Sequence, residues 1–449
     1  MKFSKKRVGR SLMDNDILLA MLTPDERRAP EGVGGNRFTS SLGYWSYRRL
    51  FVSTSFAGLA NWTLLVARGW LAFQLTGSST WVGVVTFAGF LPFVFGPVGG
   101  VLADRYQRKL LAAFSTALGS ALSLMLAALT IAGVLQPWAL ALITVAMSLP
   151  RAAELPARQA LIANVVPPEE LLNAVSLSSV ATFGTRALGP AIVIPLIGSL
   201  GAGGVFCLAA AFYLIATVSV LTVRASASEP APAQAGAAGD LIDGLAYVIR
   251  TPSVAALISL VMFHCSLTMS FDSLLPAFAV QQIDAGAETF SVLAMCVGAG
   301  ALVGTVLTSG VRSEHGQARV LFTTAVLSGI TPMAMAFPMM SLPVGAVSTF
   351  AMGASQGSFM ALTGALVQVA APDALRGRVS SIYLLFAGGL MAWVNLINGA
   401  LADVWDVPLL FLGPAALYLV ILAAMFALHR PLRVVLLKGT MATEPIAVS

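Results

Sequence analysis

The chain has 449 residues, of which 57% are hydrophobic and 10% are charged, and its formal net charge is +6. A soluble domain carries about 25% charged residues, so the composition excludes a water-soluble globular protein and indicates a helical membrane protein. Many of the bases lie in the leading tail and most of the others border apolar runs, which favours a role in membrane topology over a nucleic-acid-binding face.

The first 48 residues form a polar tail that contains "KKRVGR" and "PDERRAPEGVGG". This tail has no apolar run of the kind that a secretory signal places between its basic start and its cleavage site. We expect residues 1–48 to be a disordered cytoplasmic arm.

Twelve apolar runs follow the tail, and most are close to the roughly 20 residues that a helix needs to cross a bilayer. They lie at 50–73, 81–103, 110–133, 138–160, 171–197, 204–223, 254–279, 289–311, 319–338, 342–369, 378–401 and 408–428. Between the sixth and seventh runs, the Ala, Pro and Gly content of "ASASEPAPAQAGAAGD" indicates a loose linker. The sequence therefore predicts an all-α membrane protein with twelve transmembrane helices in two six-helix bundles, at 49–224 and 253–430. A cytoplasmic linker at 225–252 joins the bundles, and a cytoplasmic tail follows at 431–449.

The distribution of Lys and Arg predicts the orientation, because cytoplasmic loops collect these residues. If the amino terminus lies inside, the outward connections near 74–80, 134–137, 198–203, 280–288, 339–341 and 402–407 contain neither Lys nor Arg. The inward connections contain Arg105, Arg108, Lys109, Arg158, Arg224, Arg250, Arg312, Arg319, Arg376 and Arg378. We therefore expect both termini to be cytoplasmic, in a multi-pass protein of the inner (plasma) membrane.

The two halves of the chain resemble each other. "ALIANVVPPEELLNAVS" follows the fourth span and "ALVQVAAPDALRGRVS" follows the tenth. "GGVLADRYQRKLL" has a faded copy in "GTVLTSGVRSEHGQARVL", where Ser309 stands at the place of Asp104. Repeated bundles around a midplane site are typical of secondary transporters.

Four stretches, "GGVLADRYQRK", "LPARQALIANVVPPEELLNAVSL", "RALGP" and "PDALRGRVSSIYLL", together resemble the major facilitator superfamily, and the likeness covers about 43–430. They are similar in particular to the branch of bacterial exporters that includes enterobactin and macrolide exporters. The resemblance implies a secondary transporter that exports small, partly hydrophobic molecules by alternating access, in exchange for protons. Two places depart from the branch: Asn61 stands where the first span often has an acid, and Val193 and Ile194 replace a Gly pair.

The loop between the second and third spans carries the gating motif that the resemblance implies, at Gly100, Asp104, Arg105, Arg108 and Lys109. Asp104 is implied to bond to Arg105, Arg108 or a neighbouring helix amino terminus in the outward-open state. Such bonds contribute about 1 to 3 kcal/mol, so they can hold a conformation and still release it. The alternative is that these charges only set topology, although topology requires the bases and not the acid.

Charged side chains within the spans are costly unless they face a partner or water. Arg186 lies about 15 residues, or roughly 22 Å, inside the fifth span, which is too deep for easy snorkelling. It is a candidate to bind an anionic or polar group of a substrate, or to pair with Glu154 of the fourth span. Arg151 and Glu154 lie three residues apart on one helical face, so a local ion pair is another alternative.

Other polar residues within the spans are candidates for the pathway of substrate or protons. Arg68 either lines a cavity or snorkels to the outer interface, and Asn61 either lines a cavity or bonds to another helix. His264 and Asp272 are candidate proton carriers, because a buried His or carboxyl group can titrate near neutral pH. The alternative for both is a structural role.

Three amides and three helix-bending residues complete the candidates. Gln356, Asn395 and Asn398 either line the pathway or form interhelical hydrogen bonds. Gly189, Pro190 and Pro195 give the fifth span the capacity to bend.

The leading prediction is a proton-coupled exporter, with a small-molecule substrate, the proton and the lipid bilayer as partners, no nucleic acid, and a monomeric state. The sequence contains no "GxxxxGK[ST]" stretch, so we do not expect this chain to hydrolyse ATP. Its three histidines, His264, His315 and His429, lie in separate segments without ligand spacing, so we predict no enzyme, metal or cofactor. An importer or facilitator of the same fold is the nearest alternative, and a membrane scaffold or receptor without transport belongs to a different class.

Overall fold

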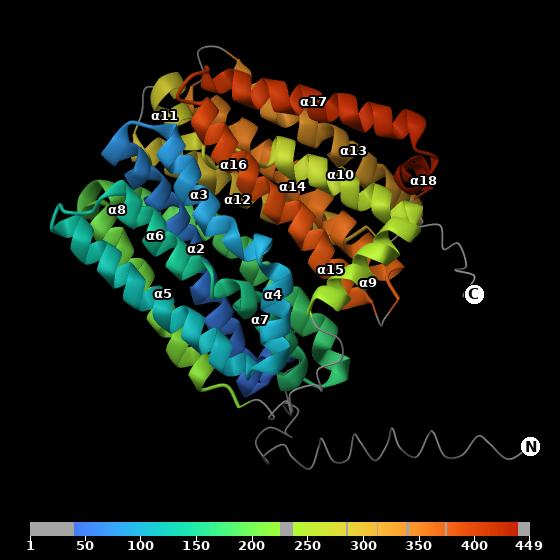
Figure 1. Cartoon of the computed structure of the whole chain (residues 1–449), viewed down its shortest axis with the longest axis horizontal. Coiled ribbons are helices and arrows are strands. Elements are labelled where there is room, and N and C mark those ends of the chain that lie inside the picture. The colour runs from blue at the N-terminus through green and yellow to red at the C-terminus, as the bar shows by residue number, and fades with distance from the viewer. Residues whose placement is uncertain are drawn as a thin grey trace, which may run out of the picture.

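The computed structural model describes residues 40–224, 237–283, 286–311, 313–337, 341–372 and 375–438, and each element in these ranges is a helix (Figure 1). Residues 1–39 of the predicted amino-terminal arm, the first part of the predicted linker and the end of the predicted carboxy-terminal tail lie outside them. The later part of that linker forms an α-helix, α9 (Ala237–Arg250). The prediction of disorder is wrong for residues 40–48, which form a short helix at Ser40–Gly43 and the start of a helix at Trp45. Residues 431–438 of the predicted tail belong to a helix that begins at Arg430.

The N-terminal half of the chain, residues 40–224, begins with the short helix η1 (Ser40–Gly43) and is built of seven α-helices. They are α2 (Trp45–Thr76), α3 (Ser79–Val94), α4 (Gly96–Arg105), α5 (Arg108–Ile131), α6 (Pro137–Ser148), α7 (Arg151–Val165) and α8 (Leu171–Leu221), with η2 (Pro168–Glu170) before α8.

The described part of the C-terminal half begins with α9 and continues through helices of unequal length. They are α10 (Pro252–Thr268), α11 (Leu275–Ile283), α12 (Ala287–Ser309), α13 (Glu314–Met333), η3 (Ala334–Ala336), α14 (Leu342–Ala370), α15 (Arg376–Leu384), the π-helical η4 (Leu385–Gly389), α16 (Leu390–Leu401), α17 (Val407–Leu428) and α18 (Arg430–Lys438).

Eight helical stretches in the described residues are long and apolar enough to cross a membrane, and two bent pairs raise the number to ten. The pairs are α3 with α4, bent by 48°, and α9 with α10, bent by 105°. The predicted fifth and sixth spans are joined in α8, whose backbone leaves helical geometry at Gly201 (φ 64°, ψ −179°). The predicted bending residues Gly189, Pro190 and Pro195 lie within α8, before this break.

Small residues allow two helices of the C-terminal half to pack backbone to backbone. A Cβ added at Gly353 of α14 would lie 2.0 Å from the Val297 carbonyl oxygen of α12, and one added at Gly300 would lie 2.0 Å from the Phe350 carbonyl oxygen. Neither position has room for a side chain. This contact is the close approach that small residues permit between membrane helices.

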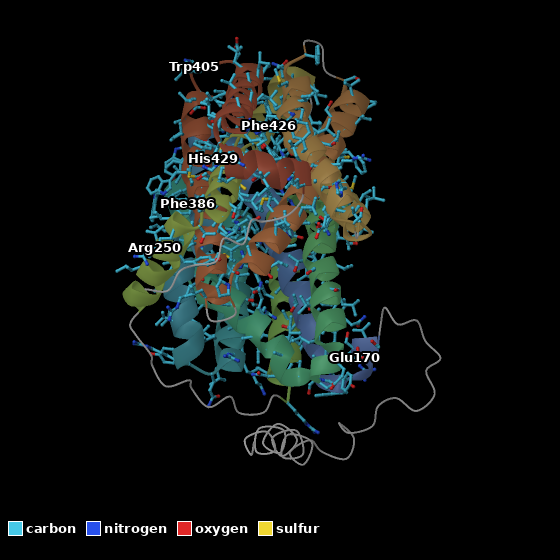
Figure 2. The ribbon with its side chains drawn as sticks, turned by 90° about the vertical axis from the view of Figure 1, so that its right-hand side faces the viewer. Glu170, Arg250, Phe386, Trp405, Phe426 and His429 are labelled. Carbon is cyan, nitrogen blue, oxygen red and sulfur yellow. The ribbon has the colours of Figure 1, made fainter. Side chains whose placement is uncertain are left out.

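The two halves of the chain meet along α3, which lies beside α16 (Figure 1). The rings of Phe87 and Trp393 lie 4.6 Å apart in this contact. Figure 2 shows Trp405 near one end of the helical body and Glu170 near the other. We call these ends the Trp405 end and the Glu170 end.

Candidate functional site

The predicted seventh span is broken in the middle. It was expected to be continuous from 254 to 279, but α10 ends at Thr268, α11 begins at Leu275, and the residues between them form turns. The prediction of one continuous helix is therefore wrong. Asp272 lies in the break, and its side chain is partly buried.

Two amides of α16 hold the unwound backbone in place. The Asn395 Oδ1 atom accepts a hydrogen bond of 3.2 Å from the Ser273 amide, and the Asn398 Nδ2 atom donates one of 2.6 Å to the Ser270 carbonyl. These bonds satisfy backbone groups that the break frees, as irregular backbone within a membrane requires. Asn395 therefore has the interhelical role that was the alternative to lining the pathway.

Arg186 of α8 lies where the two halves of the chain meet. Its guanidinium carbon lies 5.0 Å from the centre of the Trp62 ring of α2. Asp272 of the other half is near enough to contribute to the electrostatic environment of Arg186, although no ion pair within 4.0 Å joins the two side chains. A Cβ added at Gly298 of α12 would lie 2.5 Å from the Arg186 carbonyl oxygen. The backbone of the other half therefore approaches Arg186 closely, and an aromatic face, a cation and a carboxylate gather beside the broken helix.

Glu154 does not pair with Arg186 or Arg151, so both predicted partners are wrong. The Arg158 Nε atom lies 2.6 Å from the Glu154 Oε1 atom, and the Ser115 hydroxyl donates to the Oε2 atom at 2.5 Å. Arg158 was expected in an inward connection, but it is buried within α7, where its Nη1 atom also donates to the Ser53 hydroxyl at 2.9 Å. The pair thus links α7 to α2 and α5.

Arg151 donates a hydrogen bond to the Asn61 side-chain oxygen. Asn61 therefore forms the helix-to-helix bond that was the alternative to a free place in a cavity. Arg68 is only 5% exposed, and its Nε atom donates to the Leu64 carbonyl at 3.1 Å. Because the side chain is buried, the prediction that it snorkels to the interface is wrong.

His264 and Gln356 lie in the core of the C-terminal half. The imidazole of His264 is fully buried, 4.2 Å from the Phe359 ring and 5.6 Å from the Tyr418 ring, and its Nε2 atom has no hydrogen-bond partner among the described residues. The Gln356 side chain donates to the Thr268 carbonyl at 2.8 Å, at the end of α10. Gln356 therefore also supports the start of the helix break.

The predicted gating motif lies at the junction of α4 and α5. Gly100, Asp104 and Arg105 belong to α4, and Arg108 and Lys109 begin α5. The Lys109 ammonium donates to the Val223 carbonyl at 2.8 Å, just after α8. The side chain of Asp104 lies outside the described side chains, so its latch role stays a prediction.

At the Trp405 end, Asp403 of the C-terminal half caps the start of α3 in the other half. Its Oδ1 atom accepts from the Ser79 amide at 2.6 Å, and its Oδ2 atom accepts from the Thr80 amide at 3.0 Å. The Ser78 and Thr80 hydroxyls also donate to Oδ2, at 2.5 and 2.6 Å. First-turn amides have no partner within their own helix, so a carboxylate more than 300 residues away replaces the local cap. Asp403 was not among the candidate residues predicted from the sequence.

A family model described as "Transmembrane secretion effector" matches residues 40–439. The chain belongs to the major facilitator superfamily. It is a multi-span transporter rather than an enzyme, and the predicted all-α membrane class is confirmed.

Curated relatives of this chain include bacterial exporters. The enterobactin exporter EntS of Shigella boydii is 29% identical over 356 residues, which cover 75% of this chain and 80% of that protein. Macrolide efflux protein A of Streptococcus pyogenes is 23% identical over 321 residues, with coverages of 69% and 77%. The uncharacterised transporter YfiS of Bacillus subtilis is 30% identical over 209 residues, and the match spans only 49% of YfiS and 45% of this chain.

Among solved structures, a single-residue variant of the nucleoside transporter NupG has the same fold. The two share 15% identity, the match covers 85% of this chain and 100% of that chain, and the TM-score is 0.71. At this identity the similarity supports the fold and does not indicate a substrate.

Proposed function

We propose that this chain is a proton-coupled exporter of small, partly hydrophobic molecules, built of twelve spans in two six-helix bundles with both termini in the cytoplasm. It lies in the plasma (inner) membrane, with the Trp405 end outward and the Glu170 end inward. The observation that carries the proposal is the cluster of Arg186, Trp62 and Asp272 beside the broken helix. The names of the two exporters among the relatives support the direction of transport.

The position of the cluster favours a substrate site. Helices that are interrupted within the membrane bring polar groups into the span, and transporters of several folds bind cargo at such interruptions. Here the two faces of the site come from different halves: Arg186 and Trp62 from one, and Asp272 from the other. A movement of one half relative to the other would therefore change the contacts of a cargo bound between them.

The chemistry of the cluster suits a cargo with an apolar or aromatic body and polar groups. The Trp62 ring offers an aromatic face, the Arg186 guanidinium offers donors, and the Asp272 carboxylate offers acceptors. A proton that binds Asp272 removes the charge that holds a donor group of the cargo. Proton and cargo then compete for one carboxylate, which is a simple basis for antiport.

Two junctions are proposed to control access to this site. Asp403 closes the outer end by holding α3 of one half to the C-terminal half, through the four bonds described above. The loop at Asp104 acts at the inner end, as its motif predicts. Opening to the outside then requires the Asp403 bonds to break.

Export can be tested in cells that lack their own major exporters. The chain and its variants are expressed at matched levels, and the metabolites of the medium and the cells are compared without preselection, with added fluorescent drugs as a second readout. We expect one set of compounds to leave the cells with the chain, and about tenfold slower export with Arg186→Ala or Asp272→Asn, because each loses a charge-assisted contact.

The exposed side chains Arg433 and Glu314 supply matched controls, and Arg433→Ala and Glu314→Gln should export normally. Accumulation of the same compounds inside the cells would instead establish an importer or facilitator. Equal metabolite profiles with and without the chain would favour the scaffold or receptor.

A further inference from the structure

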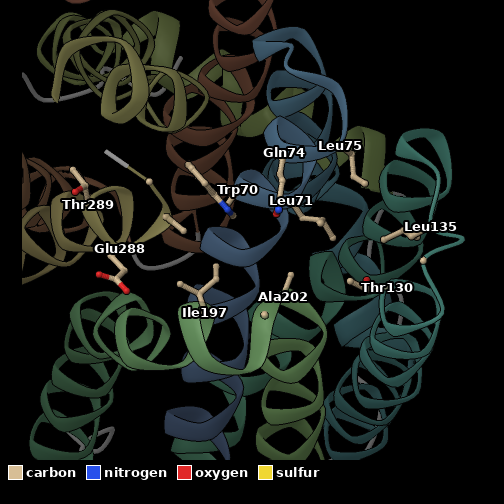
Figure 3. Close-up of a pocket in the computed structure, with 15 residues that line it drawn as sticks. Trp70, Leu71, Gln74, Leu75, Thr130, Leu135, Ile197, Ala202, Glu288 and Thr289 are labelled. Atoms are coloured by element: carbon tan, nitrogen blue, oxygen red, sulfur yellow. The ribbon is translucent and has the colours of Figure 1, made fainter. Parts of the chain in front are cut away.

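A separate cavity has a volume of about 760 Å³ (Figure 3). It lies toward the Trp405 end, because the end of α2 that lines it leads to Ser78, which bonds to Asp403. Its walls come from the end of α2, the connection after α5, the break in α8 and the start of α12, so both halves contribute. The side chains that give it chemical character are Trp70, Gln74, Thr130, Glu288 and Thr289. Its volume falls within the roughly 300 to 1,000 Å³ of small-molecule sites.

Among the described residues that line the cavity, one side chain is charged: that of Glu288, which is exposed. Its Oε1 atom lies 3.0 Å from the place of a Cβ on Gly198, so the carboxylate of α12 reaches the wall that α8 supplies. The segments that border the cavity, within 74–80, 134–137, 198–203 and 286–288, contain no Lys or Arg. The carboxylate is therefore not neutralised by a base from these segments.

An aromatic wall lies on the α2 side of the same cavity. The Trp70 ring stacks on Phe290 of α12, with centroids 6.4 Å apart and an angle of 24° between the planes. The stacking holds the indole at the border between the two halves. An indole face and a carboxylate attract the same class of ligand, because both favour a cation.

We propose that this cavity binds an organic cation with an apolar or aromatic body, at a site distinct from the Arg186 cluster. The charge at the two sites differs. The Arg186 cluster contains both a cation and a carboxylate, whereas the only charged group among the described residues that line the Glu288 cavity is the Glu288 carboxylate. The outward position of the cavity rests on the proposed topology, but binding itself requires neither that topology nor export.

The position of Glu288 has a simpler explanation that the test must exclude. An acid in the first turn of a helix is stabilised by the helix dipole, and Glu288 occupies the first turn of α12. Glu314 occupies the first turn of α13 and is likewise exposed, but it does not line the cavity. Glu314→Gln is therefore a matched control for charge, helix position and exposure.

The test measures equilibrium binding of methyltriphenylphosphonium to the purified full-length protein in lipid nanodiscs, with neutral triphenylphosphine oxide as the size-matched comparison. We expect saturable binding of the cation and much weaker binding of the oxide. Glu288→Gln should weaken binding of the cation about fivefold, the upper range for a partly exposed ion pair. Trp70→Ala should weaken it by a similar factor through loss of the cation–π contact, and Trp70→Phe should retain most of it.

Binding should be unchanged in Glu314→Gln and should persist in Asp272→Asn, which removes the carboxylate of the other site. Equal binding of cation and oxide, or wild-type affinity in Glu288→Gln, would overturn the proposal. Because no transport is measured, failure of the proposed export would leave this result intact. A loss of binding in Asp272→Asn alone would assign the cation to the other site and equally reject this one.

Discussion

In the N-terminal half, α7 supplies charged side chains that bond within that half, whereas in the C-terminal half α16 supplies neutral amides that bond to unwound backbone. Glu154 and Arg158 form a buried ion pair, while Asn395 and Asn398 hold the break between α10 and α11. A buried ion pair is costly to separate, but interhelical hydrogen bonds in membranes contribute only about 0.6 to 1.7 kcal/mol. We therefore expect the first arrangement to stay fixed during transport and the second to rearrange.

The largest expected effect comes from breaking the ion pair. Glu154→Gln leaves the Arg158 cation buried without its counter-charge, so we expect a loss of about 3 kcal/mol or more in the free energy of unfolding. The measurement is unfolding of the purified protein by heat and by SDS. The exposed Glu169 supplies the control, since Glu169→Gln should change stability little.

A double variant separates rigidity from transport. Glu154→Leu with Arg158→Leu removes both charges, and apolar replacement of a buried pair is often close to neutral. This variant should recover most of the stability that Glu154→Gln loses, and it should transport normally per folded molecule. Transport that fails in a stable double variant would show that the pair takes part in the cycle, and would overturn the comparison.

A smaller effect on stability is expected in the C-terminal half. Asn398→Ala removes the bond to the Ser270 carbonyl, which should cost about 1 kcal/mol. Transport per folded molecule should nevertheless fall more than in the ion-pair double variant, because the amide positions the segment that carries Asp272. Thr349→Ala, which removes a hydroxyl that bonds only within α14, is the matched control for a buried polar loss.

The helical class and most span positions could be predicted because they depend on local composition. The first span was expected at 50–73, and α2 runs from Trp45 to Thr76. The break at 269–274 could not be predicted, because "LTMSFDSLLP" continues the apolar run and the amides that hold the break lie more than 120 residues away. Hydropathy indicates whether a segment can lie in the membrane, but it does not indicate where the helical hydrogen bonds of that segment are interrupted.

The partner of Glu154 had a local signal that was overlooked. Arg158 follows it by four residues, and a Glu placed four residues before a base is the favourable order on a helix. Asp403 had no such signal, since nothing near Ser79 indicates that its cap comes from the other half. Long-range polar contacts of this kind depend on how the two halves pack against each other, and this packing cannot be predicted from a single sequence.

Asp403 joins the N-terminal and C-terminal halves of the chain. Removal of its carboxylate has the smallest expected effect on stability. Asp403→Asn removes the charged cap of α3, worth about 1 kcal/mol for an ordinary N-cap. Hydrogen exchange of the Ser79 and Thr80 amides measures it directly, because both donate to Asp403. Their protection should fall about fivefold. Asp406→Asn is the control, because Asp406 lies three residues away and its side chain caps no helix amide of α17.

The pH dependence of the same bonds provides the sharper test. Partial burial raises the pKa of Asp403, but the hydrogen bonds from Ser78, Thr80 and the Ser79 amide lower it by more, so it lies below its ordinary 3.8. A carboxyl group with a lowered pKa contributes its full stabilisation of the folded contact at pH values above its ordinary pKa. It loses this contribution as the pH falls through its lowered pKa. Protection of the two amides, corrected for the intrinsic exchange rate, should therefore be equal at pH 8 and pH 5. Suppose instead that amide protection decreases between pH 8 and pH 5 in the wild type but not in Asp403→Asn. Asp403 would then bind protons between pH 5 and pH 8, and the cap would take part in proton coupling instead of being a fixed contact.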